Sequence, residues 1–104
     1  MAANVLFISY LGVPDIHSAG ISVNQNYPNP CNNTTVINYN LVKPADVSLT
    51  VTDLAGRELL SQNYGTTNSG QHSITLNAAD FSSGIYFYSI TSSGYTITKK
   101  MVVY

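Results

Sequence analysis

The feature that most constrains this chain is the alternation of apolar and polar side chains in residues 84–104. Side chains spaced two apart lie on the same face of a β-strand. The common faces hold Tyr86, Tyr88 and Ile90 before the turn, and Tyr95, Ile97, Met101 and Val103 after it. Ser92-Ser93-Gly94 has the composition of a tight turn between two strands. The pattern therefore predicts a β-hairpin that includes the last residues of the chain.

Two adjacent lysines interrupt this hairpin. Lys99 lies on the apolar face of the second strand, and Lys100 follows it. One interpretation is a β-bulge, or an edge strand protected from aggregation by lysine. The other is a recognition feature, because the chain holds only 4 Lys and Arg residues in total. The sequence leaves both interpretations open.

Composition limits the partners that the chain can have. Charged residues make up 9% of the 104 residues, and the net charge is −1. Nucleic-acid binding and anionic-membrane binding both need a basic surface that 4 cations cannot form. No apolar run approaches the 18 or so residues of a transmembrane helix, so direct membrane insertion is not expected. The Asn, Ser, Thr and Tyr content is typical of a β-rich extracellular domain.

Residues 1–20 differ from the rest. The run Val5-Leu-Phe-Ile-Ser-Tyr-Leu-Gly-Val13 resembles the apolar region of a signal peptide, but the residues before it include no Lys or Arg. We expect an upstream linker or strand remnant, or an artificial leader, ahead of a domain formed by residues 21–104. A signal peptide is the less favoured alternative.

The same alternation continues through residues 21–83. Strands are predicted at 21–25, 34–41, 47–52, 57–64 and 72–76, with a polar turn at 65–70. A helical turn is possible at 77–83, where Phe81 is expected to enter the core. Together with the hairpin, this makes about seven strands joined by Gly, Pro and Asn turns, which predicts an all-β, Ig-like antiparallel β-sandwich. The expected core comprises Ile37, Tyr39, Leu49, Val51, Leu76, Tyr86, Tyr88 and Ile90.

Tyr27-Pro-Asn-Pro30 is predicted to be a structural turn. Its two prolines fix φ near −65° and donate no backbone hydrogen bond, so the segment cannot continue a sheet. We expect this turn to fix the entry of the chain into the sandwich, with Tyr27 packed over one end of the core.

Residues with chemical potential are few and scattered. A nucleophilic pair of Cys31 with His72 has no third group in evidence, and an inert loop thiol is the simpler interpretation. Single carboxylates at or near turns are typical of turn-closing residues; they are Asp46, Asp53, Glu58 and Asp80. Asn32 and Asn33 begin N-glycosylation patterns, which arise easily in such a sequence. No catalysis, cofactor or metal is expected.

Several blocks, taken in order, resemble a known family. They are Asn26-Tyr-Pro-Asn-Pro30, Asn33-Thr-Thr-Val-Ile-Asn-Tyr-Asn-Leu41 with Lys43-Pro44, Val51-Thr-Asp-Leu-Ala-Gly-Arg-Glu58, Gly84-Ile-Tyr-Phe-Tyr88 and Thr98-Lys-Lys-Met-Val-Val103. Together they cover residues 21–104 and are similar to the type A C-terminal sorting domains of the bacterial type IX secretion system. Cys31 departs from the family pattern, where Phe or a small residue is common, and a free thiol in this loop could permit adventitious dimerisation.

The resemblance implies a function. Such domains follow an upstream cargo domain, direct it through the periplasm and across the outer membrane of Bacteroidota-type bacteria to the cell surface or medium, and are removed by a surface sortase. Translocon, shuttle and sortase components are the implied partners, and cleavage is expected within residues 13–23. Recognition is expected at the final strand, residues 96–104, through Lys99, Lys100, Met101, Val102 and Val103. The alternative is a structural Ig-like adhesion or scaffold module. The oligomeric state is left open.

Overall fold

The computed structural model describes residues 20–104, so the leader and signal-peptide interpretations of residues 1–19 lie outside the described residues. The described chain forms seven strands and one short 3-10 helix. The strands are β2 (Ile21–Val23), β3 (Thr34–Leu41), β4 (Ala45–Asp53), β5 (Glu58–Thr67), β6 (Gly70–Asn77), β7 (Gly84–Ser92) and β8 (Tyr95–Val103), and the helix is η2 (Ala78–Asp80).

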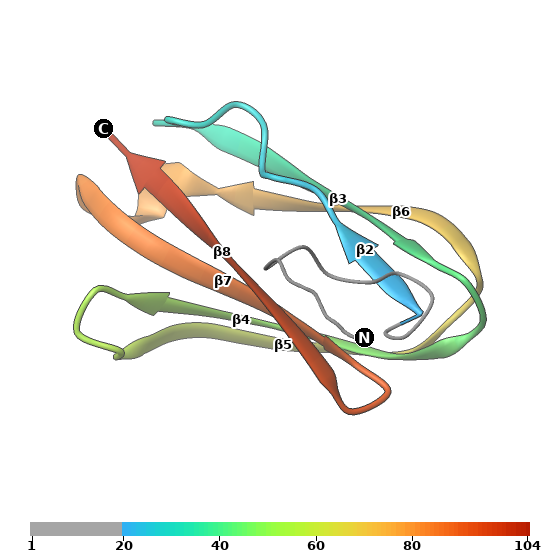
Figure 1. Cartoon of the computed structure of the whole chain (residues 1–104). Helices are drawn as coiled ribbons and strands as arrows, with labels where there is room; N and C mark the ends of the chain where they lie inside the picture. The colour runs from blue at the N-terminus through green and yellow to red at the C-terminus, as the bar shows by residue number, and fades with distance from the viewer. Residues whose placement is uncertain (1–19) are drawn as a thin grey trace, which may run out of the picture.

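The strands form two antiparallel sheets that pack as two layers (Figure 1). Sheet I has the order β2-β3-β6, and sheet II has the order β5-β4-β7-β8. β2–β3, β4–β5 and β7–β8 are each joined within one sheet, whereas the β3–β4, β5–β6 and β6–β7 connections cross between the layers. This arrangement confirms the predicted Ig-like antiparallel sandwich.

The core lies between the two inner faces. Buried and accessible positions alternate along strands such as β3 and β7, whereas β5 has no buried residue. All eight residues predicted for the core are at most 7% exposed, which confirms the prediction. The core also contains residues that the prediction did not name: Ile21, Val23, Cys31, Leu41, Val47, Ile74, Ala78, Ile97, Met101 and Val103.

The β7–β8 hairpin forms the longest ladder of the fold that has no register shift. Its nine residue pairs run from Gly84 opposite Val103 to Ser92 opposite Tyr95, without a register shift. Ser93 and Gly94 form the turn with φ of 51° and 83°, the left-handed geometry that matches a twisted hairpin. The turn therefore has two residues rather than the predicted three. The prediction of a bulge at Lys99 is wrong, because the ladder has no register shift there. The prediction that Lys99 lies on an edge strand is confirmed, because β8 is at the edge of sheet II.

Strand β5 corrects the prediction for residues 65–70. The strand continues to Thr67, and Gly65 lies opposite Val47 where the β4–β5 register shifts. Gly65 has φ of 69°, and its N–H donates to Asn63 Oδ1 at 2.8 Å. A glycine with positive φ inside a strand is characteristic of a β-bulge. The glycine that indicated a turn therefore marks an irregularity within the strand.

The predicted helical turn after β6 is present as η2. The Asn77 side chain accepts a hydrogen bond from the Ala79 N–H and so caps the helix. Phe81 then packs against the core while remaining partly exposed, and its ring stacks on Tyr86 with centroids 5.1 Å apart. Entry of Phe81 into the core is thus partial.

Candidate recognition site

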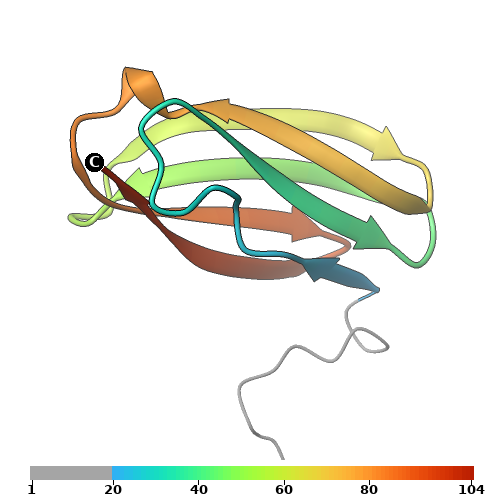
Figure 2. The same ribbon diagram turned by 90° about the horizontal axis from the view of Figure 1, so that it is seen from above.

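Residues 24–31, the closing segment, join β2 to the C-terminal strand. The segment first hydrogen-bonds to sheet I, through Asn24 N–H to Asn38 O and a reciprocal pair between Tyr27 and Val36, each at 2.9 Å. It then crosses to sheet II, where Cys31 forms a parallel bridge with Val103. Figure 2 shows this loop beside the C-terminal end of β8. The closing segment therefore covers the gap between the sheet edges at β2 and β8.

The closing segment also occupies the outer edge of β8. Cys31 N–H donates to Val102 O at 2.9 Å, and Tyr104 N–H donates to Cys31 O at 3.0 Å. Side chains add two bonds: Val102 N–H donates to Asn29 Oδ1 at 3.0 Å, and Gln25 Nε2 donates to Lys100 O at 2.6 Å. The outer edge of β8 is therefore already hydrogen-bonded within the domain at its C-terminal end.

The expected packing of Tyr27 over the core is wrong. Tyr27 is 79% exposed, while the preceding Asn26 is buried. Asn26 Nδ2 donates to Pro28 O at 3.1 Å and to Thr35 Oγ1 at 2.9 Å. The inward position goes to the amide because it satisfies polar atoms of the turn that would otherwise be buried without partners. Tyr27 therefore faces outward. Both X-Pro bonds of the turn are cis.

Tyr88 anchors the closing segment to sheet II. Its side chain is fully buried, and its hydroxyl donates to Asn24 O at 2.9 Å and accepts from Asn26 N–H at 2.8 Å. Burial raises the pKa of Tyr88 to about 12, although the hydrogen bond from Asn26 offsets part of that rise. Because a buried tyrosine hydroxyl needs a partner, the predicted burial of Tyr88 was the one sequence signal for this contact.

Thr35 completes this buried polar cluster. It is fully buried at the start of β3, and its hydroxyl donates to Pro28 O at 2.8 Å. Thr35 thus connects the closing segment to sheet I, as Tyr88 connects it to sheet II. The sequence indicated that Thr35 shares a face with Ile37, but not that its hydroxyl has a structural role.

Cys31 is a free thiol, but it is buried in this packing. It is 1% exposed, and Sγ donates to Val102 O at 3.5 Å. Burial raises the pKa of the Cys31 thiol, and a hydrogen bond with Thr35 opposes the rise. The adventitious dimerisation that a free loop thiol could permit would require an accessible thiol, and in the folded domain this thiol is not accessible.

His72 does not pair with the thiol. Its Nε2 lies 2.7 Å from Asn68 O, and its ring stacks on Tyr39 with centroids 5.3 Å apart. The structure therefore gives each member of the candidate nucleophilic pair a different partner.

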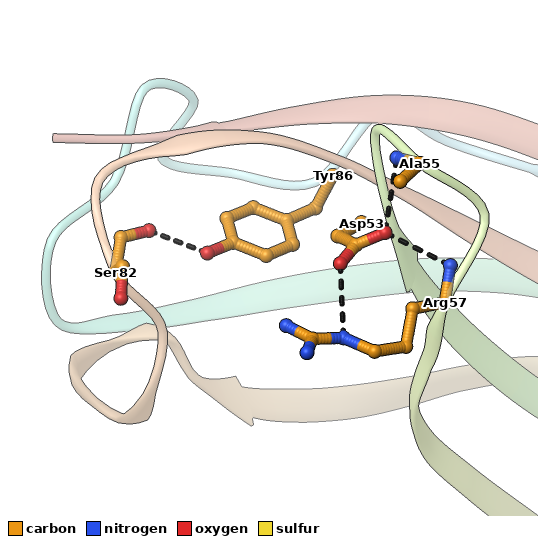
Figure 3. Close-up of polar contacts among 5 residues, drawn as sticks. All are labelled: Asp53, Ala55, Arg57, Ser82 and Tyr86. Atoms are coloured by element: carbon orange, nitrogen blue, oxygen red, sulfur yellow. Dashed lines mark hydrogen bonds and ion pairs between the residues drawn. The ribbon is translucent and has the colours of Figure 1, made fainter.

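The carboxylate of Asp53 has a structural role in the β4–β5 turn (Figure 3). Oδ1 accepts from the N–H groups of Ala55 at 3.0 Å and Arg57 at 2.8 Å, and Oδ2 lies 3.1 Å from Arg57 Nε. Tyr86, which pairs with Asp53 across the β4–β7 ladder, donates its hydroxyl to Ser82 O at 2.6 Å. These contacts order one end of sheet II.

The five proposed recognition residues fall into two groups. Met101 and Val103 point into the core and are buried. Lys100 is exposed and Val102 is half-buried on the outer face, while Lys99 is half-buried opposite Tyr88. In the folded domain, a partner therefore reaches Lys100, Val102 and part of Lys99.

Two further properties concern the described residues alone. Between residues 20 and 104, no group of three or more His, Cys, Asp or Glu side chains has the arrangement of a metal site. In the same range, no helix is long and apolar enough to cross a membrane.

Comparison with known proteins first supports the fold class. A DUF3244 family protein from Bacteroides vulgatus, described as an immunoglobulin-like β-sandwich, superposes with a TM-score of 0.53 at 18% identity. The match covers 79% of this chain and 94% of that protein. A comparison with curated proteins finds no match.

The family follows from the sequence match. A model of the secretion system C-terminal sorting domain matches residues 25–104. The chain therefore belongs to this family, the C-terminal sorting domains of type IX secretion. Membership implies interaction with the type IX machinery, and export to the cell surface or secretion in Bacteroidota-type bacteria.

Proposed function

We propose that this domain is the export signal of a cargo protein carried upstream of it, and that it directs this cargo across the outer membrane through the type IX translocon. The observation that carries the proposal is the family match over residues 25–104, which includes residues 25–31 of the closing segment and the C-terminal strand. Shuttle and sortase components are further proposed partners. The proposed role is recognition, without catalysis or a cofactor.

The contacts around β8 support a signal that is presented in one defined conformation. The strand is paired with β7 along its whole length on one side. On its other side, hydrogen bonds with Gln25, Asn29 and Cys31 hold its last residues. Met101 and Val103 would then contribute by anchoring the strand in the core, and Lys99, Lys100 and Val102 by contacting the machinery.

Sortase cleavage is proposed close to the start of the domain, within residues 13–23. The burial of Ile21 and Val23 in β2 favours the earlier part of this range. Cleavage inside β2 would require this strand to leave β3, whereas cleavage before Gly20 leaves the described sandwich intact.

An export assay tests the proposal. The full chain is fused to the C-terminus of a periplasmic reporter in a type IX-competent host. The proposal predicts that the reporter reaches the surface or the medium, and that it stays in the periplasm of an isogenic strain lacking the translocon. Periplasmic retention of a folded fusion in the competent host would contradict the signal function and favour the scaffold module.

A further inference from the structure

The outward side chains of the β7–β8 hairpin divide into two halves of different chemistry. Near the Ser93-Gly94 turn, hydroxyl groups satisfy one another across the two strands. Ser89 Oγ lies 2.8 Å from Thr98 Oγ1, and Thr91 Oγ1 lies 3.0 Å from Thr96 Oγ1. This half needs no partner to satisfy its polar groups.

The other half is apolar with one cation. Ile85 pairs with Val102, and Phe87 pairs with Lys100. Ile85 is 38% exposed, Phe87 and Val102 are partly exposed, and Lys100 is exposed. These four residues are called the C-terminal patch.

The sandwich itself gives no role to the C-terminal patch. The inward neighbours on the same strands, Tyr86, Tyr88, Met101 and Val103, already form the core. Elsewhere on these two strands, the outward positions carry Ser and Thr, which suit a solvated β-sheet face. The apolar side chains of the patch therefore remain available to a partner.

The charge of the patch indicates the chemistry of that partner. Within residues 20–104, the single ion pair joins Asp53 to Arg57, so no described carboxylate neutralises Lys100. The residue paired with Lys100 is Phe87, and the residue paired with Phe87 on the next strand is Thr52. A complementary surface would combine apolar side chains with a carboxylate facing Lys100.

We propose that the type IX machinery recognises the C-terminal patch as a folded, two-strand surface, through a protein component that presents apolar groups and a carboxylate. This inference rests on the proposed function. It differs from recognition of a linear tail, because Ile85 and Phe87 belong to β7. It also differs from strand addition at the end of β8, whose outer edge is hydrogen-bonded to the closing segment.

A pair of double variants on the same face separates these alternatives. The test variant is Ile85→Thr with Phe87→Thr, which gives the patch the chemistry of the rest of the face. The matched control is Ser89→Ala with Thr98→Ala, a facing pair on β7 and β8 in the other half of the same hairpin. Reporter export is expected to fall at least tenfold for the test variant and to stay near wild type for the control.

Folding is measured on the purified full-chain variants by circular dichroism and thermal melting. A second variant addresses the charge without touching an apolar group: Lys100→Glu is expected to lower export more than Lys100→Gln, since it opposes the partner's carboxylate. Lys100 is exposed, so both variants are expected to keep the wild-type melting temperature within a few degrees.

The outcomes distinguish this inference from the proposed function. If the wild-type fusion is not exported, the proposed function fails. If the wild-type fusion is exported and the folded Ile85→Thr/Phe87→Thr variant is exported equally well, the patch is not the recognition surface and the inference is overturned. Export of a reporter carrying residues 95–104 alone would also overturn it, because that tail lacks β7.

Discussion

The two sides at which the sheet edges face each other differ: one is covered by the closing segment and the other is open. On one side, the closing segment covers the gap between β2 and β8 with hydrogen bonds to both sheets. On the other side, the β5 and β6 edges flank a groove of about 530 Å3, and nothing among residues 20–104 fills it. Its apolar lining includes Leu59, Leu60, Tyr64 and Phe81, all of them exposed or half-buried.

The buried side-chain hydrogen bonds are concentrated on the closed side of the sandwich. The closed side contains a buried cluster in which Asn26, Thr35 and Tyr88 satisfy the polar atoms of a proline-containing turn. When one of these side chains is removed, its hydrogen-bond partner stays buried without a partner, which lowers the stability of the fold. The open side contains side chains that solvent can reach. We therefore expect equal substitutions to have unequal effects on the two sides.

The largest expected effect compares two tyrosines. Tyr88→Ala removes a fully buried ring on the closed side and is expected to lower the free energy of unfolding by about 3–5 kcal/mol. Tyr64→Ala, at the open groove, is expected to cost less than about 1 kcal/mol. Urea denaturation measures both. Equal losses for the two variants would break the comparison.

The second effect depends on pH and comes from the same buried hydroxyl. Tyr88 ionises at about pH 12 in the folded domain and near pH 10 in the unfolded chain. The contribution of the neutral Tyr88 hydroxyl to the free energy of unfolding is fully present below pH 10. As the pH rises toward 12, this contribution is lost, by about 2–3 kcal/mol in total. Burial also raises the pKa of Tyr39 and Tyr64.

Tyr88→Phe is the control for this pH effect. The variant has no ionisable group at position 88, so its stability is expected to fall less steeply between pH 10 and 12 than that of the wild type. Urea midpoints across this range provide the measurement. Parallel curves for the two proteins would show that Tyr88 does not carry the effect.

The third effect concerns the amide of the closing segment. Asn26→Ala leaves polar atoms of the turn without this partner, and a loss of about 1–3 kcal/mol is expected. Gln62→Ala removes an exposed amide at the open groove and is expected to change stability by about 0.5 kcal/mol or less. Thermal melts of both variants test the difference, and a Gln62 effect as large as that of Asn26 would contradict it.

The smallest expected effect is that of Tyr27→Ala. Because the side chain is largely exposed, the stability change is expected to stay within about 0.5 kcal/mol. Chemical denaturation measures it. A loss of unfolding free energy above about 2 kcal/mol would show that Tyr27 packs against the core, and would contradict the structure.

The parts of the fold that follow local periodicity were predictable. Alternation located all seven strands and the eight predicted core residues, because a residue buried between two sheets recurs every second position. The turn predicted to begin at Gly65 was wrong because glycine with positive φ occurs in both turns and β-bulges. The two-residue turn at Ser93-Gly94 differed from the prediction only in length.

The site was less predictable because it depends on contacts distant in sequence. Alternation placed Lys100 and Val102 on one face of the last strand, but it could not show that the segment at Asn29 covers the edge of that strand. Tyr27 was expected to pack over one end of the core. In an irregular segment, however, the need to pair buried backbone groups decides which side chain points inward, and this favoured Asn26.

Native-state hydrogen exchange tests most directly whether the closing segment locks the C-terminal strand. The account predicts that the amides of Cys31, Val102 and Tyr104 exchange slowly in the wild type, far more slowly than that of Leu54 at the exposed β4–β5 turn. It also predicts that Tyr88→Phe accelerates the three amides together while the β7–β8 ladder stays protected. Exchange of Val102 as fast as that of Leu54 in the wild type would contradict the account.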